Sequence, residues 1–310
     1  MTPRLIIHGG AGRAFKDASR GPIVRAALHS VCEVVYAELA SGMTAMDAVL
    51  MGCRLLETDP NFNAGTGSAI QSDGRIRMTA SIMDGKRQAF SGIVNVESVE
   101  HPIDMAASLN DAPDRVIAGE GAAWLAREMA LPIHEPATAK RMAEWMDEKR
   151  RGFGSEPVEV VAHGTEHRTG TIGVVALDVH GDIVAGTSTG GRGYERVGRV
   201  SDCAMPAGNY ATAHVGISCT GIGEDIIDEC FAARVAVRVE DGMRLTTAME
   251  RSIDEAARRE RMLGAIAISR DGDVVWGKAS DLLLAAWDIG FGVKDCVDAP
   301  LGPMVKHVGG

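Results

Sequence analysis

The feature that most constrains the fold is an abrupt change of character at the Gly170–Thr171 bond. Residues 151–170 are polar, rich in glycine and charge, and lack a regular apolar period, so they predict a linker or exposed loop. From Thr171 onward, two apolar, β-branched segments flank the turn signal at 178–182, which predicts a hairpin of interior strands. The same design recurs at 264–278. Strands of this kind must be covered on both faces.

Helical spacing of apolar residues supplies candidates for the covering layers. Residues 4–7 form a short apolar run that predicts a buried strand ending in a tight, glycine-rich loop at 8–12. Thr44, with Asp47 three residues later, resembles a capping box and predicts a helix start. The predicted helices cover about 22–41, 44–57, 102–109, 119–130, 136–150, 223–239 and 244–260. Strands, two helices and strands again favour sheets covered by helical layers.

Composition narrows the class of protein. The chain has 310 residues, 45% of them hydrophobic, enough for one large domain or two moderate ones. A net charge of −10 argues against nucleic acid or an anionic membrane as a partner. No run of about 18 apolar residues predicts a spanning helix, and residues 1–12 lack a secretory signal. Six scattered cysteines without a CxxC pair predict reduced thiols, and we expect a cytoplasmic protein.

The Gly170–Thr171 step has a chemical interpretation. A threonine hydroxyl is a weak nucleophile at neutral pH unless a base lies beside it. A free α-amine on the same residue is such a base, since its pKa of about 7.7–8.0 is near working pH. Only a cut before Thr171 exposes that amine, and Gly170 tolerates the strained geometry that attack on its carbonyl requires. On the spacing alone, an ordinary strand start is the favoured interpretation of Gly170-Thr171.

Short motifs along nearly the whole chain resemble one family. They are HGGAG at 8–12, DPNFNAGTGS at 59–68, MDG at 83–85, GEGA at 119–122, GTIGVVALD at 170–178, TSTGG at 187–191, GRVSD at 198–202 and SCTGIGED at 218–225. In this order and spacing they resemble the plant-type L-asparaginase/isoaspartyl peptidase family of N-terminal nucleophile hydrolases.

The resemblance implies an α+β fold, a four-layer αββα sandwich. It implies one domain over 1–310, cut by the chain itself into 1–170 and 171–310, with the pieces remaining together. The implied partners are small molecules, L-asparagine and β-aspartyl dipeptides, whose side-chain amide is hydrolysed. A homodimer of processed units and no catalytic cofactor are also implied.

Site residues follow from the resemblance position by position. Thr171 matches the nucleophile, and Thr189 matches a hydroxyl that bonds near it. Thr220 and Gly221 match the oxyanion hole, which needs a hydroxyl and a backbone N–H. Asn63 matches a polar residue close to the nucleophile.

Two further sites are implied. Arg199 and Asp202 match the pair that binds the α-carboxylate and α-ammonium of a zwitterionic substrate. The 56–66 loop resembles a structural sodium site made by backbone carbonyls, oxygens that hard cations favour. Its candidate residues are Leu56, Glu57, Asp59, Phe62, Ala64 and Thr66.

Other interpretations of these residues remain. Arg199 and Asp202 without the family match would be a surface ion pair. His8 is expected to be a hydrogen-bonded loop histidine rather than a base. His163 and His167 form HxxxH in the linker without a third ligand, so a metal site there is not expected. Cys219 has no histidine placed to activate it as a nucleophile.

The chain also departs from the family pattern. GRVSDCAMPAGNY replaces a GRVGDSP-type run, and GKASDLLLAAW stands where relatives have N-T-x-G-M. These changes leave the preferred substrate open. Two alternative functions are a glycosylasparaginase, which the missing signal and disulfide pattern disfavour, and an unprocessed relative that binds an amino acid without catalysis.

Overall fold

The computed structural model describes residues 1–15, 17, 19–153 and 170–309, and places their strands in two sheets. The first sheet has the order β12-β11-β1-β5-β6-β2-β3-β4, and the second β13-β10-β9-β8-β7. The strands are β1 (Arg4–Gly12), β2 (Met78–Asp84), β3 (Ala89–Val96), β4 (Val116–Ala118), β5 (Ile172–Leu177), β6 (Ile183–Thr189), β7 (Asn209–Ala211), β8 (Val215–Gly221), β9 (Leu263–Ser269), β10 (Val274–Lys278), β11 (Leu282–Asp288), β12 (Lys294–Asp295) and β13 (Met304–Val308). The helices are α1 (Arg20–Ala40), α2 (Ala45–Thr58), α3 (Pro102–Ser108), α4 (Glu120–Glu128), α5 (Ala139–Arg150), α7 (Gly223–Glu229), α8 (Phe231–Glu240) and α9 (Leu245–Arg258), with a 3-10 turn η1 at Asp202–Ala204.

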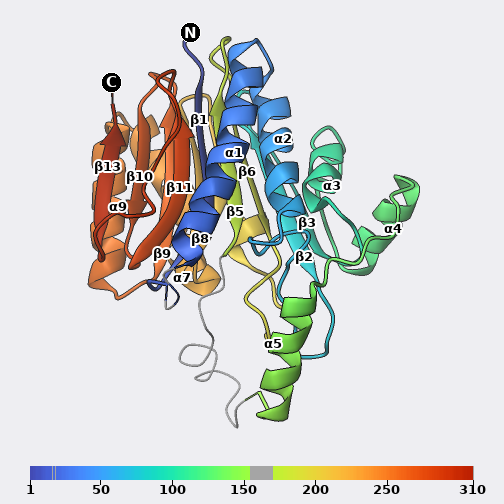
Figure 1. Ribbon diagram of the computed structural model, residues 1–310. Coiled ribbons are helices and arrows are strands. Elements are labelled where there is room, and N and C mark those ends of the chain that lie inside the picture. The colour runs from blue at the N-terminus through green and yellow to red at the C-terminus, as the bar shows by residue number, and fades with distance from the viewer. Residues whose placement is uncertain (16, 18, 154–169, 310) are drawn as a thin grey trace.

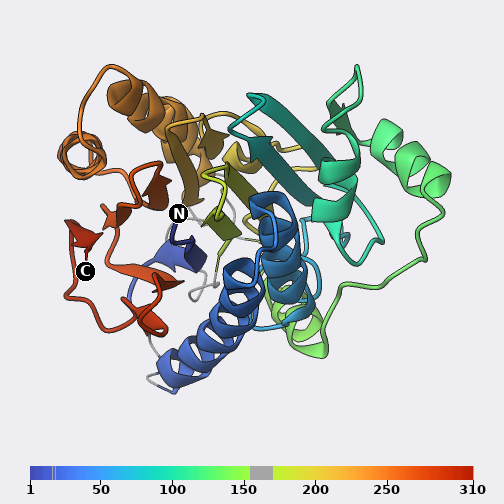
Figure 2. The ribbon, with the colours of Figure 1, turned by 90° about the horizontal axis from the view of Figure 1, so that it is seen from above.

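The two sheets face each other between layers of helices, as expected from the sequence. Helices α1, α2 and α3 pack on the first sheet, while α8 and α9 pack on the second. Strands β1, β5 and β6 of the first sheet contact β8 or β9 of the second. In Figure 2 the blue helices and the orange helices lie on opposite sides of the strands. Helices α4 and α5 extend beyond this sandwich (Figure 1). The fold is therefore the α+β sandwich predicted above.

Alternation along the inner strands decides which residues face the space between the sheets. On β5, Ile172 and Val174 pack toward the helices, whereas Val175 and Leu177 join the core between the sheets. Because side chains of a strand point to opposite faces in turn, residue 171 faces the inter-sheet space. This apolar core gives way at one end to polar residues, and that end holds the candidate site.

The predicted cut would divide the first sheet in an interleaved way. Strand β1, which precedes residue 170, lies between β11 and β5, which follow it. Strands β5 and β6 are in turn paired with β1 on one side and β2 on the other. The two segments therefore alternate within one hydrogen-bonded sheet.

Most predicted elements are confirmed, and two boundaries were wrong. The glycine-rich 8–12 run is not a loop but the second half of β1, which continues through a bulge between His8 and Ala11. Gly10 has φ +127°, a value that glycine permits. The predicted helix start is confirmed, since the Thr44 hydroxyl accepts from the Asp47 amide at 3.1 Å, while the Asp47 carboxylate accepts from the Thr44 hydroxyl.

The single helix predicted over 223–239 is two helices. Cys230 has left-handed dihedrals, φ +46° and ψ +45°, and separates α7 from α8. The helix breaks there because of a contact with a segment distant in the sequence. The Ala232 amide donates to the Ala207 carbonyl, and the Ala233 amide donates to the Pro206 carbonyl. Among the described residues, we find no helix with the length and apolar character needed to cross a membrane.

Candidate active site

Three threonines meet at the polar end of the inter-sheet space. Thr171 lies immediately before β5, is 8% exposed, and donates its hydroxyl to Thr189 Oγ1 at 3.1 Å. Thr189 ends β6, and its Oγ1 also accepts from the Gly191 amide at 3.2 Å. Thr220, on β8 of the other sheet, is fully buried. We call Thr171, Thr189 and Thr220 the threonine cluster.

Thr220 has a free hydroxyl beside the bond that the sequence predicts to be cut. Its Oγ1 is buried without a hydrogen-bond partner among the described residues. A Cβ at Gly170 would lie 3.3 Å from that oxygen and 3.5 Å from the Gly10 Cα. A buried hydroxyl without a partner is costly, so this one is available to a group that develops charge nearby.

Gly221 and Asn63 shape the backbone around the threonine cluster. Gly221 has φ +137°, and a Cβ there would lie 2.4 Å from the Met262 carbonyl oxygen. Asn63 is 3% exposed and donates Nδ2–H to the Gly191 carbonyl at 2.6 Å, while its Oδ1 accepts from the Ala69 amide. Asn63 thus holds the turn after β6 and reaches the threonine cluster through Gly191 rather than directly.

The ionisable residues gather in a separate group. Arg199 donates Nε–H and Nη2–H to the two carboxylate oxygens of Glu224, both at 3.0 Å. Asp202, at the start of η1, is 3% exposed, and its Oδ2 has no hydrogen-bond partner among the described residues. A Cβ at Gly223 would lie 2.7 Å from Arg199 Nη2 and 2.8 Å from Asp202 Oδ1. Glycine at 223 therefore lets the backbone approach both groups; Arg199, Asp202 and Glu224 are called the charged cluster.

Burial sets the protonation of the charged cluster. Burial raises the pKa of Asp202 to about 7, although the Arg199 charge opposes the rise. Burial also disfavours the charge of Arg199, but hydrogen bonds to Glu224 outweigh it and raise the pKa of Arg199. The same bonds outweigh burial at Glu224 and lower the pKa of its carboxyl. Near neutral pH, Asp202 is thus the member whose charge changes most readily.

The 56–66 loop brings backbone carbonyls close together. The Glu57 carbonyl accepts from the Thr66 amide at 2.7 Å, and the Asp59 carbonyl accepts from the Phe62 amide at 3.1 Å. A Cβ at Gly67 would lie 2.8 Å from the Pro60 oxygen and 3.0 Å from the Phe62 oxygen. Leu56 and Ala64 are fully buried beside them. Carbonyl oxygens converging on a glycine are compatible with a hard cation, and each retains a second lone pair.

The carboxylate of Glu57 connects this loop to the threonine cluster. Its Oε1 accepts from the Ser188 hydroxyl at 2.5 Å, and Ser188 immediately precedes Thr189. Burial raises the pKa of Glu57, against hydrogen bonds from His101 and Ser188. The described residues contain no group of three or more His, Cys, Asp or Glu side chains suited to a metal ion. The HxxxH pair, His163 and His167, lies outside the described residues.

Sequence reasoning missed several polar residues of the site. Glu224 lies inside the SCTGIGED motif, which was the available signal, but the motif does not reveal its bond to Arg199, 25 residues away. His8, Thr187 and Ser218 form a buried chain next to the threonine cluster. Cys219, considered above as a nucleophile, is fully buried, and burial raises the pKa of its thiol well above the usual value.

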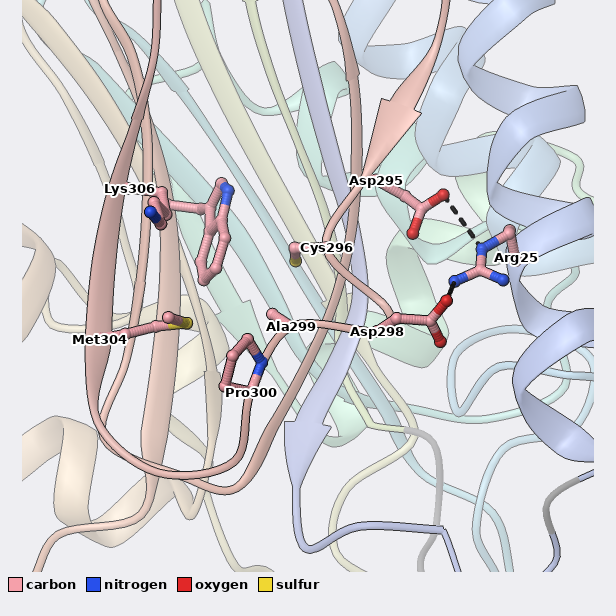
Figure 3. Close-up of a pocket in the computed structure, with 9 residues that line it drawn as sticks. Arg25, Asp295, Cys296, Asp298, Ala299, Pro300, Met304 and Lys306 are labelled. Atoms are coloured by element: carbon pink, nitrogen blue, oxygen red, sulfur yellow. Dashed lines mark hydrogen bonds and ion pairs between the residues drawn. The ribbon is translucent and has the colours of Figure 1, made fainter.

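A hollow elsewhere in the molecule belongs to neither cluster. It lies where α1, β12 and β13 meet and is lined in part by Trp276. Met304 and Lys306 lie on one side of it (Figure 3). Arg25 on the other side donates to Asp295 at 3.0 Å and pairs with Asp298 at 2.5 Å. None of these residues belongs to the motifs described above, so we leave this hollow out of the active site.

Two facing sheets between helical layers, with a threonine at the start of a central strand, define the class of N-terminal nucleophile hydrolases. The comparisons agree. A family model described as asparaginase matches residues 1–297, and the chain belongs to this family, the plant-type asparaginases. It is 54% identical over 301 residues to an isoaspartyl peptidase/L-asparaginase of Synechocystis sp., covering 96% of this chain and 91% of that protein.

Two other relatives carry the same name. An isoaspartyl peptidase/L-asparaginase of Nostoc sp. is 50% identical over 313 residues, covering 99% of this chain and 98% of the relative. One of Homo sapiens is 33% identical over 297 residues, covering 93% and 94%. The similarity spans nearly the full length of each protein, so both clusters lie inside the matched region.

Proposed function

We propose that this chain is an autoproteolytic amidohydrolase that hydrolyses the side-chain amide of L-asparagine and the isopeptide bond of β-aspartyl dipeptides. The names of its relatives from Synechocystis and Nostoc support this activity. The single structural observation that carries it is the threonine cluster beside Gly170. In it the Thr171 and Thr189 hydroxyls bond to each other, and the Thr220 hydroxyl has no partner within the described part of the chain.

Self-cleavage uses the same groups. The Thr171 hydroxyl attacks the Gly170 carbonyl carbon, the bond from that carbon to the Thr171 nitrogen breaks, and the hydroxyl proton passes to this nitrogen, so the acyl group moves from nitrogen to oxygen. We expect Thr220 to donate a hydrogen bond to the oxyanion of that step, which is supported by the 3.3 Å that would separate its Oγ1 from a Cβ at Gly170. Water then hydrolyses the ester, and the products are a carboxylate on Gly170 and a free α-amine on Thr171.

Substrate hydrolysis follows with that amine as the base. The amine takes the proton of Oγ1 as Oγ1 attacks the substrate's amide carbonyl, and Thr189 orients the attacking hydroxyl. Thr220 Oγ1–H and the Gly221 N–H stabilise the oxyanion. The protonated amine then gives its proton to the leaving ammonia or amine. Water releases aspartate from the acyl-enzyme and restores Thr171.

The charged cluster suits the other end of the substrate. Ionised Asp202, with its unpaired Oδ2, binds the α-ammonium, and Arg199 binds the α-carboxylate. Arg199 uses its Nε–H and one Nη2–H on Glu224, so the carboxylate is left with the second Nη2–H and the two N–H groups of Nη1. Glu224 thereby fixes the guanidinium and restricts how a substrate carboxylate can approach it.

The converging carbonyls of residues 56–66 support a structural sodium ion in our proposal. Bound there, the ion would stabilise the loop that carries Asn63 and, through Glu57 and Ser188, the end of β6. It takes no part in the chemistry, which requires no cofactor. The homodimer of processed units and the cytoplasmic location stay predictions; size-exclusion chromatography with light scattering tests the first.

A denaturing gel combined with an ammonia assay tests the proposed function. Purified protein should yield two fragments that split after residue 170, with the second beginning at Thr171 by N-terminal sequencing. The processed protein should release ammonia from asparagine and leucine from β-aspartyl-leucine. Thr171→Ala should abolish cleavage and hydrolysis together, by roughly 10⁴-fold or more. A persistent full-length band that still binds asparagine would instead support the non-catalytic relative.

A further inference from the structure

A second set of polar residues lies one step deeper than the threonine cluster. The Ser218 hydroxyl lies 3.0 Å from His8 Nε2 and 2.7 Å from Thr187 Oγ1. All three side chains are fully buried. Ser218 belongs to β8 of the second sheet, whereas His8 and Thr187 belong to β1 and β6 of the first. We call these three residues the hydroxyl–imidazole chain, and it joins the two sheets.

The hydroxyl–imidazole chain crosses directly above the strand that carries the nucleophile. His8 and Thr187 are the two cross-strand neighbours of Gly173 on β5. A Cβ at Gly173 would lie 2.0 Å from Ser218 Oγ and 2.3 Å from His8 Nε2. No side chain fits there, which explains why the last residue of the GTIG motif, Gly173, is a glycine. The missing side chain lets Ser218 reach both neighbours at once.

The hydroxyl–imidazole chain carries no net charge. Burial lowers the pKa of His8 to about 3, against a hydrogen bond to the Thr171 backbone that opposes the shift. A neutral imidazole offers one donor and one acceptor, and a hydroxyl can donate once and accept. Ser218 can therefore satisfy both of its neighbours in either direction without burying a charge. The two hydrogen bonds of Ser218 hold the three side chains in one arrangement.

Two members, Thr187 and Ser218, are each two residues from a threonine of the threonine cluster on the same strand, and so is Gly173, which lies between His8 and Thr187. Thr187 is followed by Thr189, Ser218 by Thr220, and Gly173 is preceded by Thr171. Strand residues two apart move together, since about 6.5 Å of extended backbone joins them. Fixing Ser218 against Thr187 and His8 thus fixes Thr220 against Thr189 and Thr171.

We propose that His8, Ser218 and Thr187 are positioning residues that set the distance between the nucleophile and the oxyanion hydroxyl. They touch neither substrate nor the reacting atoms. The inference rests on the proposed function, in which Thr171 attacks and Thr220 stabilises the oxyanion. It adds that the rate of both reactions depends on a hydrogen-bonded chain outside the threonine cluster, because small misplacements of reacting groups cost large factors in rate.

Matched substitutions of one residue test this. Thr187→Val keeps the shape and removes the hydroxyl, whereas Thr187→Ser keeps the hydroxyl and removes a methyl group. Ser218→Ala removes the central member. Ser269→Ala is the control, because Ser269 is a buried serine on the neighbouring strand β9 whose hydroxyl accepts only from the Asp273 amide in the described structure. Melting temperature, the rate of self-cleavage, and kcat and KM of processed protein are measured for each.

We expect Thr187→Val and Ser218→Ala to lower kcat and slow self-cleavage about 10- to 100-fold, with KM within twofold of wild type. Thr187→Ser and Ser269→Ala should stay within about threefold in kcat. Equal kcat for Thr187→Val and Ser269→Ala would overturn the inference, as would failure of Thr187→Ser to rescue. If Ser218→Ala does not fold, the two Thr187 variants decide. An inactive, uncut wild type would instead defeat the proposed function and this inference with it.

Discussion

The two halves of the site are held by different forces. In the threonine cluster and the chain behind it, the hydrogen-bonding groups are hydroxyls, backbone amides and an imidazole kept neutral by burial. In the charged cluster, Arg199 is bound by the carboxylate of Glu224 and faces the buried carboxyl of Asp202. The difference indicates that the catalytic rate depends on the geometry of the first half, whereas substrate binding depends on the protonation of the second half and on ionic strength.

The largest effect expected after loss of Thr171 itself is in the neutral half. Thr220→Val keeps the volume of the side chain and removes the unpaired hydroxyl beside Gly170. Removing one oxyanion donor should lower kcat about 10²- to 10³-fold and slow self-cleavage, while KM changes little. Steady-state kinetics and a time course on gels measure both. A change confined to KM would mean that Thr220 acts in substrate binding, as the charged cluster does, and would contradict the division of the site into two halves.

A smaller effect, in KM, is expected from the charged half. Arg199→Lys keeps the charge but loses the planar pair of bonds to Glu224. We expect kcat/KM for asparagine to fall about 30- to 100-fold, mainly through KM, because the guanidinium that binds the substrate carboxylate loses its charge-assisted hydrogen bonds. Self-cleavage, which needs no substrate carboxylate, should proceed at the wild-type rate. Slower self-cleavage in this variant would show that the two halves are coupled.

The pH profile sharpens the contrast. Because the pKa of Asp202 is raised to about 7, its carboxyl is protonated below that pH and loses its attraction for the substrate ammonium. We expect Asp202 to contribute a roughly tenfold fall in kcat/KM per pH unit below about 7, in addition to the fall caused by protonation of the Thr171 amine. Asp202→Asn should have a low kcat/KM at every pH. Its pH dependence should lack the part due to Asp202 and follow only the titration of the Thr171 amine. A wild-type profile identical in shape to that of Asp202→Asn would contradict the assignment.

The same titration affects stability in the opposite direction. An acid whose pKa is raised on folding binds its proton more tightly in the native state. Between the ordinary value of 3.8 and about 7, Asp202 therefore lowers the free energy of unfolding as pH rises. Thermal melts of wild type and Asp202→Asn from pH 4 to 8 should diverge, with the variant more stable at the upper end.

The smallest effect is expected at Glu224. Glu224→Gln keeps a hydrogen-bond acceptor for Arg199 and removes a negative charge that helps raise the pKa of Asp202. We expect KM to change about two- to fivefold and the acid limb of kcat/KM to move to lower pH. In the wild type, added salt should weaken the influence of the Glu224 charge on the pKa of Asp202, since Glu224 is half exposed. An unmoved acid limb would mean that Glu224 has only a structural role.

The periodicity of apolar residues in the sequence predicted those helices and strands whose boundaries depend on nearby residues alone. The β5–β6 and β9–β10 hairpins and most helices follow from apolar periodicity. The break at Cys230 was not predicted, because its cause is a loop at 206–207 that binds the following amides. The β2–β3 hairpin was also missed, since residues 78–96 show no clear alternation.

The site divides in the same way. Family motifs indicated the three threonines and Arg199 with Asp202, and the structure brings the threonines together across two sheets. The contact between His8 and Ser218 joins residues 210 positions apart, so no spacing in the sequence could indicate it. Asn63 was expected close to the nucleophile, and the coordinates add that its side chain bonds to the Gly191 backbone, a contact that the sequence does not indicate.

The interleaved order of the first sheet has a consequence for assembly. Once a chain is cut after Gly170, β1 of one piece remains wedged between β11 and β5 of the other, and each piece alone contains a sheet with gaps. Separation would require both pieces to unfold. Refolding of the cut protein would become a second-order reaction that slows on dilution, whereas the uncut chain refolds in a first-order reaction. The bond before Thr171 would thus serve as a folding template that the molecule uses once and then discards.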